Sequence, residues 1–348
     1  ALSDDEYDVV VASGEQVTAG LLALTLRNMG LNARSWMGWQ IPILTDDAHG
    51  RARIEDVPGE VLGAAMDAGE IAIVPGFQGV TRDGRITTLG RGGSDTSAVA
   101  VAAALNCPCE IYTDVDGVFT ADPRLVPRAR KLAEIDYEEM LELAQQGARV
   151  MHPRAVELGA VYNMPIVVRS SFNDNPGTLI HKGVAVEIRN KVRGIAHDTN
   201  VAKITIVGVP DRPGIAAALF APLAEHGVNV DVIVQNASLH GLTDLSFTVA
   251  RGDLSKALRL VEPVARQIGA RDVVASNGWA KVSIVGTGMQ HSPGYAARMF
   301  KALADRNINI EMITTSEIRI TCIIDEARVQ EAVQALHDAF QLEQPELA

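Results

Sequence analysis

The stretch Thr87-Thr-Leu-Gly90-Arg91-Gly92-Gly93-Ser94-Asp95-Thr-Ser97 decides how the first half of this chain folds. The alternating segment 85–89 before it predicts a strand, and the small-residue run 98–105 after it predicts a helix. Glycines allow unusual backbone angles, and a helix N-terminus presents free N–H groups to an anion. The stretch therefore predicts an anion-binding turn, in which Ser94 or Asp95 caps the helix and Arg91 adds a fork of donors. The alternative is a glycine-rich turn with an ordinary cap.

The composition excludes several classes of protein. The chain has 348 residues, of which 47% are apolar, and a net charge of −12. This length predicts roughly two or three domains with full cores, and an acidic chain without a Lys/Arg cluster argues against nucleic-acid binding. We expect no membrane span and no signal peptide. Cys107 and Cys109 have neither zinc nor disulfide spacing, so a cytoplasmic enzyme fits best.

Strand-like and helix-like segments alternate through residues 1–180. The patterns predict strands at 8–12, 71–74, 111–113 and 165–169, with a loop at 13–15. They predict helices at 17–29, 137–146 and 153–162. Such alternation is typical of a mostly parallel sheet flanked by helices, whose ligands bind beyond the carboxyl ends of the strands. The side chains expected on that rim are Glu15, Phe77, Arg91 to Asp95 and Thr113 to Asp116.

An internal repeat occupies the rest of the chain. Lys203-Ile-Thr-Ile-Val-Gly208 recurs as Lys281-Val-Ser-Ile-Val-Gly286, and the turn Pro213-Gly214 recurs as Pro293-Gly294. Each copy predicts a strand, helix, strand, strand and helix, but the second copy has no last strand and would leave an open sheet edge. We expect segment 192–197 to fill that edge, so that copy one is inserted within the sheet of copy two. The expected domains are 1–182, a linker and donated strand at 183–200, then 201–277 and 278–348.

Together these residues resemble the aspartate kinases, in which an amino-acid kinase fold precedes two ferredoxin-like βαββαβ ACT domains. The likeness covers nearly the whole chain. It implies an α/β fold and ATP-dependent phosphorylation of the β-carboxylate of L-aspartate, the first step toward lysine, threonine and methionine. The motifs that carry it are Ser13-Gly-Glu15, Gly76-Phe-Gln-Gly79, Thr88-Leu-Gly-Arg-Gly-Gly-Ser-Asp95, Tyr112-Thr-Asp-Val-Asp-Gly117, Thr120-Ala-Asp-Pro-Arg124, His152-Pro153 and Pro176-Gly-Thr178.

The resemblance also assigns roles to single residues. Arg91 and Asp95 are catalytic, Arg91 gripping the substrate α-carboxylate and Asp95 orienting charge. The substrate-binding set is Glu15, Arg91, Gly92, Gly93 and Ser94. The ATP-binding set is Thr113, Asp114, Phe119, Arg124 and Arg149, with Mg²⁺ held by phosphates and water rather than by a protein cage. His152 is interpreted as structural.

The repeat half resembles amino-acid sensors that bind lysine, threonine or both. The resemblance also implies side-by-side pairing of ACT sheets, which makes a homodimer or a dimer of dimers. Which end product inhibits, and whether a separate regulatory subunit joins, stays open. The expected allosteric residues are Asp211, Gly214, Ala216, Gln235, Asn236, Asn309, Ile310, Thr315 and Ser316.

One family feature has no counterpart in the printed sequence. Aspartate kinases open with a strand carrying Lys-Phe-Gly-Gly, and here Gly-Gly occurs only at 92–93. We therefore expect an N-terminally incomplete kinase fold and poor catalysis by the polypeptide as printed. Two alternatives remain: another amino-acid kinase, and a non-catalytic amino-acid sensor. The joint presence of Glu15, Arg91 and Asp95 with the repeat argues against both.

Overall fold

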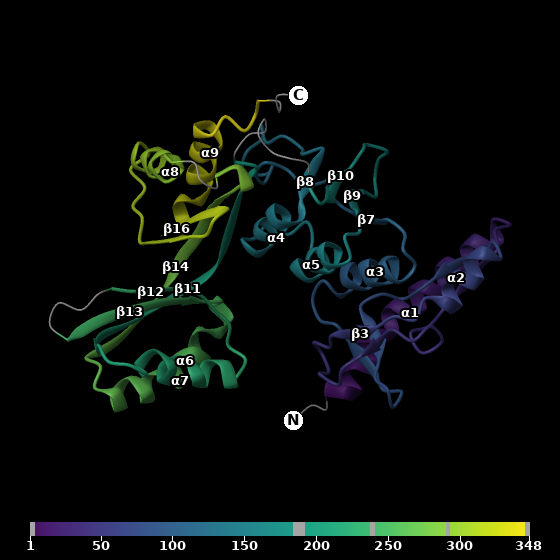
Figure 1. The fold of residues 1–348 in the computed structure, drawn as a ribbon, viewed down its shortest axis with the longest axis horizontal. Helices are drawn as coiled ribbons and strands as arrows, with labels where there is room; N and C mark the ends of the chain where they lie inside the picture. Colours follow the sequence, from purple (N-terminus) through teal and green to yellow (C-terminus); the bar gives the residue numbers. More distant parts are fainter. Residues whose placement is uncertain (1–3, 184–191, 237–240, 290–292, 345–348) are drawn as a thin grey trace. The chain divides into compact units, whose positions relative to one another are not determined.

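The computed structural model divides the chain into two compact units, residues 1–118 with 131–186 and residues 119–130 with 187–348 (Figure 1). The structure describes residues 4–183, 192–236, 241–289 and 293–344. The division differs from the expected boundary at 182, because segment 119–130 belongs to the second unit. The reason is burial: Ala121 and Val126 of this segment lie in the core of the second unit.

The first unit contains small sheets covered by helices. The sheets are β1–β4, β3–β2–β5–β6 and β7–β9–β10–β8. Parallel pairs such as β7 with β9 are accompanied by antiparallel pairs such as β9 with β10, so the sheets are more mixed than the alternating pattern predicts. The strands are β1 (Ala33–Ser35), β2 (Leu44–Thr45), β3 (Ile54–Asp56), β4 (Ile71–Ile73), β5 (Gln78–Val80), β6 (Ile86–Thr88), β7 (Cys109–Thr113), β8 (Glu134–Asp136), β9 (Ile166–Ser170) and β10 (Thr178–His181). The helices are α1 (Asp4–Asn28), α2 (Glu60–Asp67), α3 (Gly93–Ala104), α4 (Tyr137–Gln145) and α5 (Pro153–Val161).

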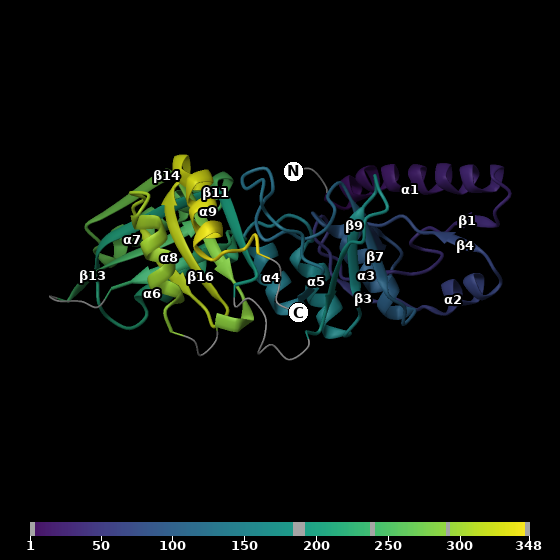
Figure 2. The same cartoon turned by 90° about the horizontal axis from the view of Figure 1, so that it is seen from above.

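Helix α1 corrects the prediction of a strand at 8–12 and a loop at 13–15. The helix runs unbroken through both segments and ends before Gly30, whose φ is +83°. The valine-rich run at 9–11 caused the error, because a short β-branched run cannot be told from a helix by periodicity alone. Figure 2 shows α1 alongside β1 and β4. Glu15 therefore lies within a helix and not on a loop after a strand.

By length and composition, α1 is also the one helix among the described residues that could cross a membrane, contrary to the expectation that no segment could. This is weak evidence, because core helices and N-terminal signal sequences pass the same test. Charged contacts fix its first turns to the first unit: Arg85 Nη2 lies 2.8 Å from both Asp5 and Glu6.

The second unit is built on one sheet, whose described strands run in the order β12–β13–β11–β14–β16–β15. The strands are β11 (Gly194–Pro210), β12 (Val230–Gln235), β13 (Leu242–Val249), β14 (Asp272–Val285), β15 (Met312–Thr315) and β16 (Arg319–Asp325). Helices α6 (Ile215–Glu225), α7 (Leu254–Ile268), α8 (Tyr295–Ala304) and α9 (Val329–Ala339) cover them. In Figure 1, α6 and α7 lie at one end of this sheet and α8 and α9 at the other.

Strands β11 and β14 are shared by both copies of the repeat. The first part of β11, residues 194–198, pairs antiparallel with residues 281–285 of copy two. The later part, residues 203–207, pairs with residues 272–276 at the end of copy one. The register shifts between these parts. Copy one is thus inserted between two strands of the sheet of copy two, and the open edge that copy two would otherwise have is covered.

The core of copy one allows a direct test of packing. Phe247 on β13 is completely buried and meets Phe220 edge to face, with 5.1 Å between the ring centroids. Phe247→Ala should lower the free energy of unfolding by about 3–5 kcal/mol, because it leaves a cavity in a close-packed core. Phe172→Ala, the same change at a residue that is 81% exposed, should cost less than about 0.5 kcal/mol. Equal losses in urea unfolding would contradict this account of the core.

Candidate functional site

The glycine-rich turn lies between β6 and α3, the predicted strand and helix. Gly90 and Gly92 have φ of +78° and +70°, and α3 begins at Gly93. A Cβ atom on Gly92 would lie 2.2 Å from the ring of His152, and one on Gly93 would lie 2.9 Å from Phe77. The N-cap is Gly92, without a side-chain cap, so the prediction of Ser94 or Asp95 as the cap was wrong. The tight left-handed turn leaves only glycine at this place.

The turn and the first residues of α3 present the predicted substrate groups. The side chains of Arg91 and Ser94 are exposed, whereas Asp95 is half-buried. The backbone N–H of His152 donates to Asp95 Oδ2 at 3.3 Å. Burial raises the pKa of the Asp95 carboxyl, and burial lowers the pKa of the His152 imidazole. His152 also caps α5 by accepting from Arg154 N, which agrees with its interpretation as a structural residue.

A buried carboxylate that was not predicted from the sequence holds the strand before the turn. Asp8 on α1 is fully buried and accepts from Thr88 N at 3.0 Å and from Thr88 Oγ1 at 2.6 Å. It also accepts from Gly50 N at 3.0 Å and lies 2.8 Å from His49 Nδ1. From the other side, Arg154 Nη1 donates to Leu89 O at 2.7 Å. The only signal in the sequence is a carboxylate directly before the apolar run 9–12.

Glu15 lies on α1 beside a residue that contacts the segment 76–79. Gln16, the next residue, donates to Gln78 Oε1 at 2.8 Å. Gln78 belongs to the segment 76–79, and a Cβ atom on Gly76 of that segment would lie 3.3 Å from Ser94. Segment 76–79 therefore lies between the Glu15 turn of α1 and the first residues of α3.

The predicted nucleotide residues are divided between the units. Thr113 ends β7, which lies beside β9, and its hydroxyl donates to Asp114 Oδ1 at 3.3 Å. Arg149 is exposed in the connection between α4 and α5. Phe119 and Arg124 belong to the second unit, where Arg124 Nη2 pairs with Asp122 at 2.7 Å.

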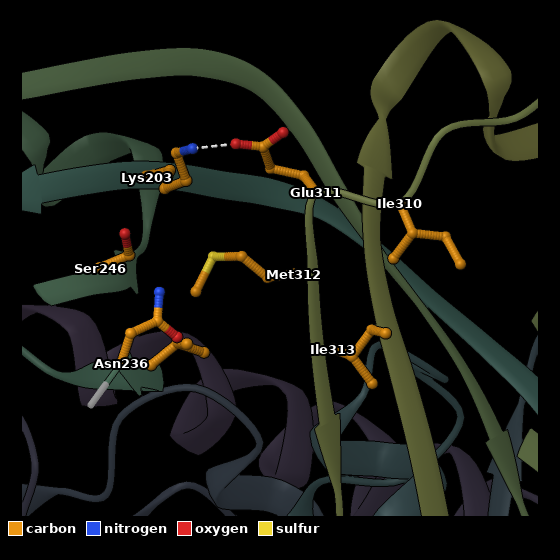
Figure 3. A pocket seen from close by; sticks show the side chains of 8 residues that line it. Lys203, Asn236, Ser246, Ile310, Glu311, Met312 and Ile313 are labelled. Atoms are coloured by element: carbon orange, nitrogen blue, oxygen red, sulfur yellow. Dashed lines mark hydrogen bonds and ion pairs between the residues drawn. The ribbon is translucent and has the colours of Figure 1, made fainter. Parts of the chain in front are cut away.

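The second unit has a cavity of about 400 Å³ between the two copies of the repeat. Figure 3 shows its lining, which includes the predicted allosteric residues Asn236 and Ile310. Lys203 of copy one forms an ion pair with Glu311 of copy two at this cavity. The complete lining is Lys203, Val234, Asn236, Ser246, Ile310, Glu311, Met312 and Ile313.

The ion pair at the cavity has a counterpart that the repeat explains. Lys281 and Asp231 occupy the repeat positions of Lys203 and Glu311, and Lys281 Nζ lies 2.5 Å from Asp231. Each copy thus contributes one lysine and one acid to two reciprocal pairs. The repeat itself is visible in the sequence, but these bridges between its copies were not predicted from it.

The remaining predicted allosteric residues lie outside the cavity lining. Gly214 begins α6 with φ of +91°, and its neighbours Asp211 and Ala216 are exposed. The others are also exposed, on or beside the edge strands β12 and β15: Gln235, Asn309, Thr315 and Ser316.

Comparisons with known proteins give consistent results. The amino acid kinase family matches residues 2–170, and the ACT domain family matches residues 204–263 and 282–340. An aspartokinase of Pseudomonas aeruginosa is 49% identical over 343 residues, which are 98% of this chain and 83% of that protein. An aspartokinase of Geobacillus stearothermophilus is 48% identical over 341 residues, again 98% of this chain and 83% of that protein.

Solved structures agree with these matches. Escherichia coli aspartokinase III in complex with aspartate and ADP, in its R-state, has a TM-score of 0.83 at 28% identity and covers 97% of this chain and 76% of its own. The same enzyme with lysine and aspartate, in its T-state, has a TM-score of 0.75 at 28% identity and covers 98% of this chain and 76% of its own. These matches confirm the predicted fold class.

Gly92 allows a test of the crowding at the turn. Gly92→Ala should cost about 1–2 kcal/mol for its left-handed backbone and more for displacing His152. Gly84 is a matched control, because its φ is +85° but an added Cβ would meet nothing within 4 Å. Gly84→Ala should therefore lose only the backbone part, and equal losses for both variants in urea unfolding would contradict the proposed contact with His152.

Proposed function

Since this chain belongs to the aspartate kinase family and is an aspartate kinase with ACT regulatory domains, we propose how its residues carry out and control the reaction. The enzyme acts as a phosphotransferase on a carboxyl acceptor: it moves the γ-phosphoryl group of ATP to the β-carboxylate of L-aspartate. The observation that carries the assignment of roles is the turn at 90–95, which presents Arg91, Ser94 and Asp95 at the N-terminus of α3. Two anions must meet here, so catalysis depends on positioning and on neutralising charge.

In this proposal the substrate is held at both of its ends. The guanidinium of Arg91 binds the α-carboxylate of aspartate, which suits its planar fork of donors. Glu15 binds the amino group, and Ser94 with the backbone of Gly92 and Gly93 completes the site. Asp95 orients charge at the reacting end, and its partial burial removes competing water. The neighbouring segment 76–79 supports this arrangement, because the Gln78 side chain bonds to Gln16 of α1 and Gly76 lies close to Ser94.

The nucleotide is assigned to residues at and after the end of β7. Thr113, Asp114 and Arg149 of the first unit take part, together with Phe119 and Arg124 of segment 119–130. The Phe119 ring can stack on the base but has no hydroxyl for a hydrogen bond. Mg²⁺ would be bound mainly by the phosphates and water, with the Asp114 carboxylate as a suitable oxygen donor. When bound, the ion neutralises charge on the transferring phosphoryl group.

Substitution at Arg91 tests the substrate assignment. Arg91→Lys keeps the charge but loses the fork, so KM for aspartate should rise roughly ten- to a hundredfold while KM for ATP stays almost constant. Arg82→Lys is the control, because Arg82 is exposed and pairs only with Glu55 at 3.1 Å among the described contacts. Unchanged KM for aspartate in Arg91→Lys would contradict the assignment. Wild-type turnover of another amino acid, but not of aspartate, would favour the other amino-acid kinases.

The ACT half is proposed to bind a free amino acid, with lysine and threonine as candidates. Escherichia coli aspartokinase III forms a T-state complex with lysine and aspartate, which supports the choice of a basic effector for this chain. The amide of Asn236 supplies both a donor and an acceptor at the cavity, and Lys203 with Glu311 supplies charges of both signs for a zwitterion. The exposed edge residues Gln235, Thr315 and Ser316 are proposed to complete effector sites between chains of a homodimer. We also propose a cytoplasmic location.

Calorimetric titration of the full chain with lysine, threonine and both together tests this assignment. Asn236→Ala should weaken effector binding roughly tenfold, because one amide contact is lost. Asn32→Ala is the matched control, since Asn32 is an exposed asparagine of the first unit and should leave the affinity unchanged. Equal affinity of Asn236→Ala and wild type would exclude Asn236 from the effector site.

A further inference from the structure

Segment 119–130 is an excursion from the first unit into the second. In the first unit, Leu132 N donates to Val118 O at 2.8 Å, which joins the two ends of the excursion. In the second unit, Thr120 N donates to Arg130 O at 2.9 Å, which joins them again. The two ends of the segment are therefore hydrogen-bonded to each other where the chain enters and leaves the second unit. All residues from 119 to 130 belong to that unit.

The segment is built into the core of ACT copy two. Ala121 and Val126 are 3% and 2% exposed and pack in the same cluster as Ile195 and Leu336. Ile195 N donates to Thr120 O at 2.8 Å, so β11 is bonded to the segment. Gln334 Nε2 on α9 donates to Leu125 O at 2.8 Å. Apolar burial and hydrogen bonds together fasten the segment to β11 and α9.

The centre of this attachment is a buried pair of side chains. Thr120 Oγ1 lies 3.0 Å from Nε2 of His337 on α9, and the two residues are 1% and 0% exposed. Thr120 Oγ1 also accepts from Arg130 N at 2.9 Å, and its own proton can be donated to His337 Nε2. In that tautomer the imidazole carries its proton on Nδ1, which has no hydrogen-bond partner among the described residues and lies 3.6 Å from Glu343 Oε2. Burial lowers the pKa of His337, which agrees with this neutral form.

Two apolar side chains in place of Thr120 and His337 could fill the same volume without needing a hydrogen bond to each other. A buried polar pair costs more if either partner moves, so it selects one arrangement of the segment against α9. A cation held by His337, Asp338 and Glu343 is a poorer explanation, because Arg128 Nη2 already lies 2.5 Å from Asp338. The pair therefore sets geometry between the segment and the helix.

The geometry between segment 119–130 and α9 bears on the proposed ATP site because of the residues that the segment carries. It carries Phe119 and Arg124, which the proposed function assigns to ATP, and α9 is the last helix of the ACT copies. We propose that Thr120 and His337 are positioning residues, which hold segment 119–130 on α9 so that the arrangement of ACT copy two sets the affinity for ATP. This inference rests on the proposed function. Coupling follows if an effector favours one arrangement of α9, and the reciprocal effect of ATP on the effector must be equal.

The test compares Thr120→Val with Thr120→Ser in the full chain. Thr120→Val keeps the volume but removes the hydroxyl, and it should raise KM for ATP roughly fivefold or more while KM for aspartate changes little. It should also reduce inhibition by lysine and threonine. Thr120→Ser keeps the hydroxyl and should behave as wild type. Gln334→Leu, which removes the bond to Leu125 O, is the milder variant to use if Thr120→Val does not fold.

Ser283→Ala controls for a merely structural role. Ser283 Oγ lies 2.7 Å from Thr321 Oγ1, in a buried pair of the same unit that joins β14 to β16. This variant should lose stability but keep KM for ATP and the inhibition. If Thr120→Val and Gln334→Leu lose only stability, like Ser283→Ala, the inference is overturned.

Calorimetric titration of the same variants with ADP separates this inference from the proposed function. Weaker ADP binding by Thr120→Val than by Thr120→Ser supports the positioning role, and equal binding overturns it. If wild type binds ADP but phosphorylates no aspartate, the proposed reaction fails while the nucleotide effect is still measured.

Discussion

The turn between β6 and α3 depends on a steric constraint that only glycine satisfies. The backbone at Gly90 and Gly92 is left-handed, and the His152 ring fills the space in which a Cβ of Gly92 would lie. A larger residue at Gly92 would clash with His152. The backbone conformation that leads into the first residues of α3 is therefore fixed. This conformation places the side chains of Arg91, Ser94 and Asp95. It also brings the Asp95 carboxylate within hydrogen-bond distance of His152 N.

A second constraint is the buried carboxylate of Asp8, which holds the strand before the turn. The fully buried carboxylate of Asp8 would be costly without partners, and it is satisfied by Thr88, Gly50 and His49. Through these bonds α1, β6 and the loop before β3 become one framework. Arg154 completes it by donating to Leu89 O and Ala52 O. The turn is thus held by Asp8 and Arg154, which are outside the set of residues proposed to bind substrate.

In the ACT half the main constraint is a sheet edge of copy two that would otherwise have no partner strand. One strand before copy one covers the edge of copy two, so β11 and β14 pass through both copies. The reciprocal pairs Lys203–Glu311 and Lys281–Asp231 then tie each copy to the other. Segment 119–130 joins the same core, so part of a chain stretch assigned to ATP rests on the regulatory fold. The chain between β7 and β8 is therefore tied to the ACT copies by packing as well as by connectivity.

Some features of this protein were determined by the sequence alone. The Gly-rich turn, the strand and helix around it, and the repeat with its Pro-Gly turns depend on local backbone preferences and on residue periodicity, which a sequence displays directly. Helix α1 was mistaken for a strand at 8–12, because its short valine run fits both structures. The residues that it buries in the fold follow a helical spacing: Asp8, Ala12, Ala19 and Ala23.

The tertiary structure alone decided the contacts between distant segments. Nothing near Thr120 in the sequence indicates His337, and nothing near Lys203 indicates Glu311. These partners meet because sheet pairing and apolar burial bring separate segments together. The free energy of both depends on many residues that are far apart in the sequence. Local patterns record which backbone conformations a segment prefers, whereas the choice of its neighbours is made by the whole fold.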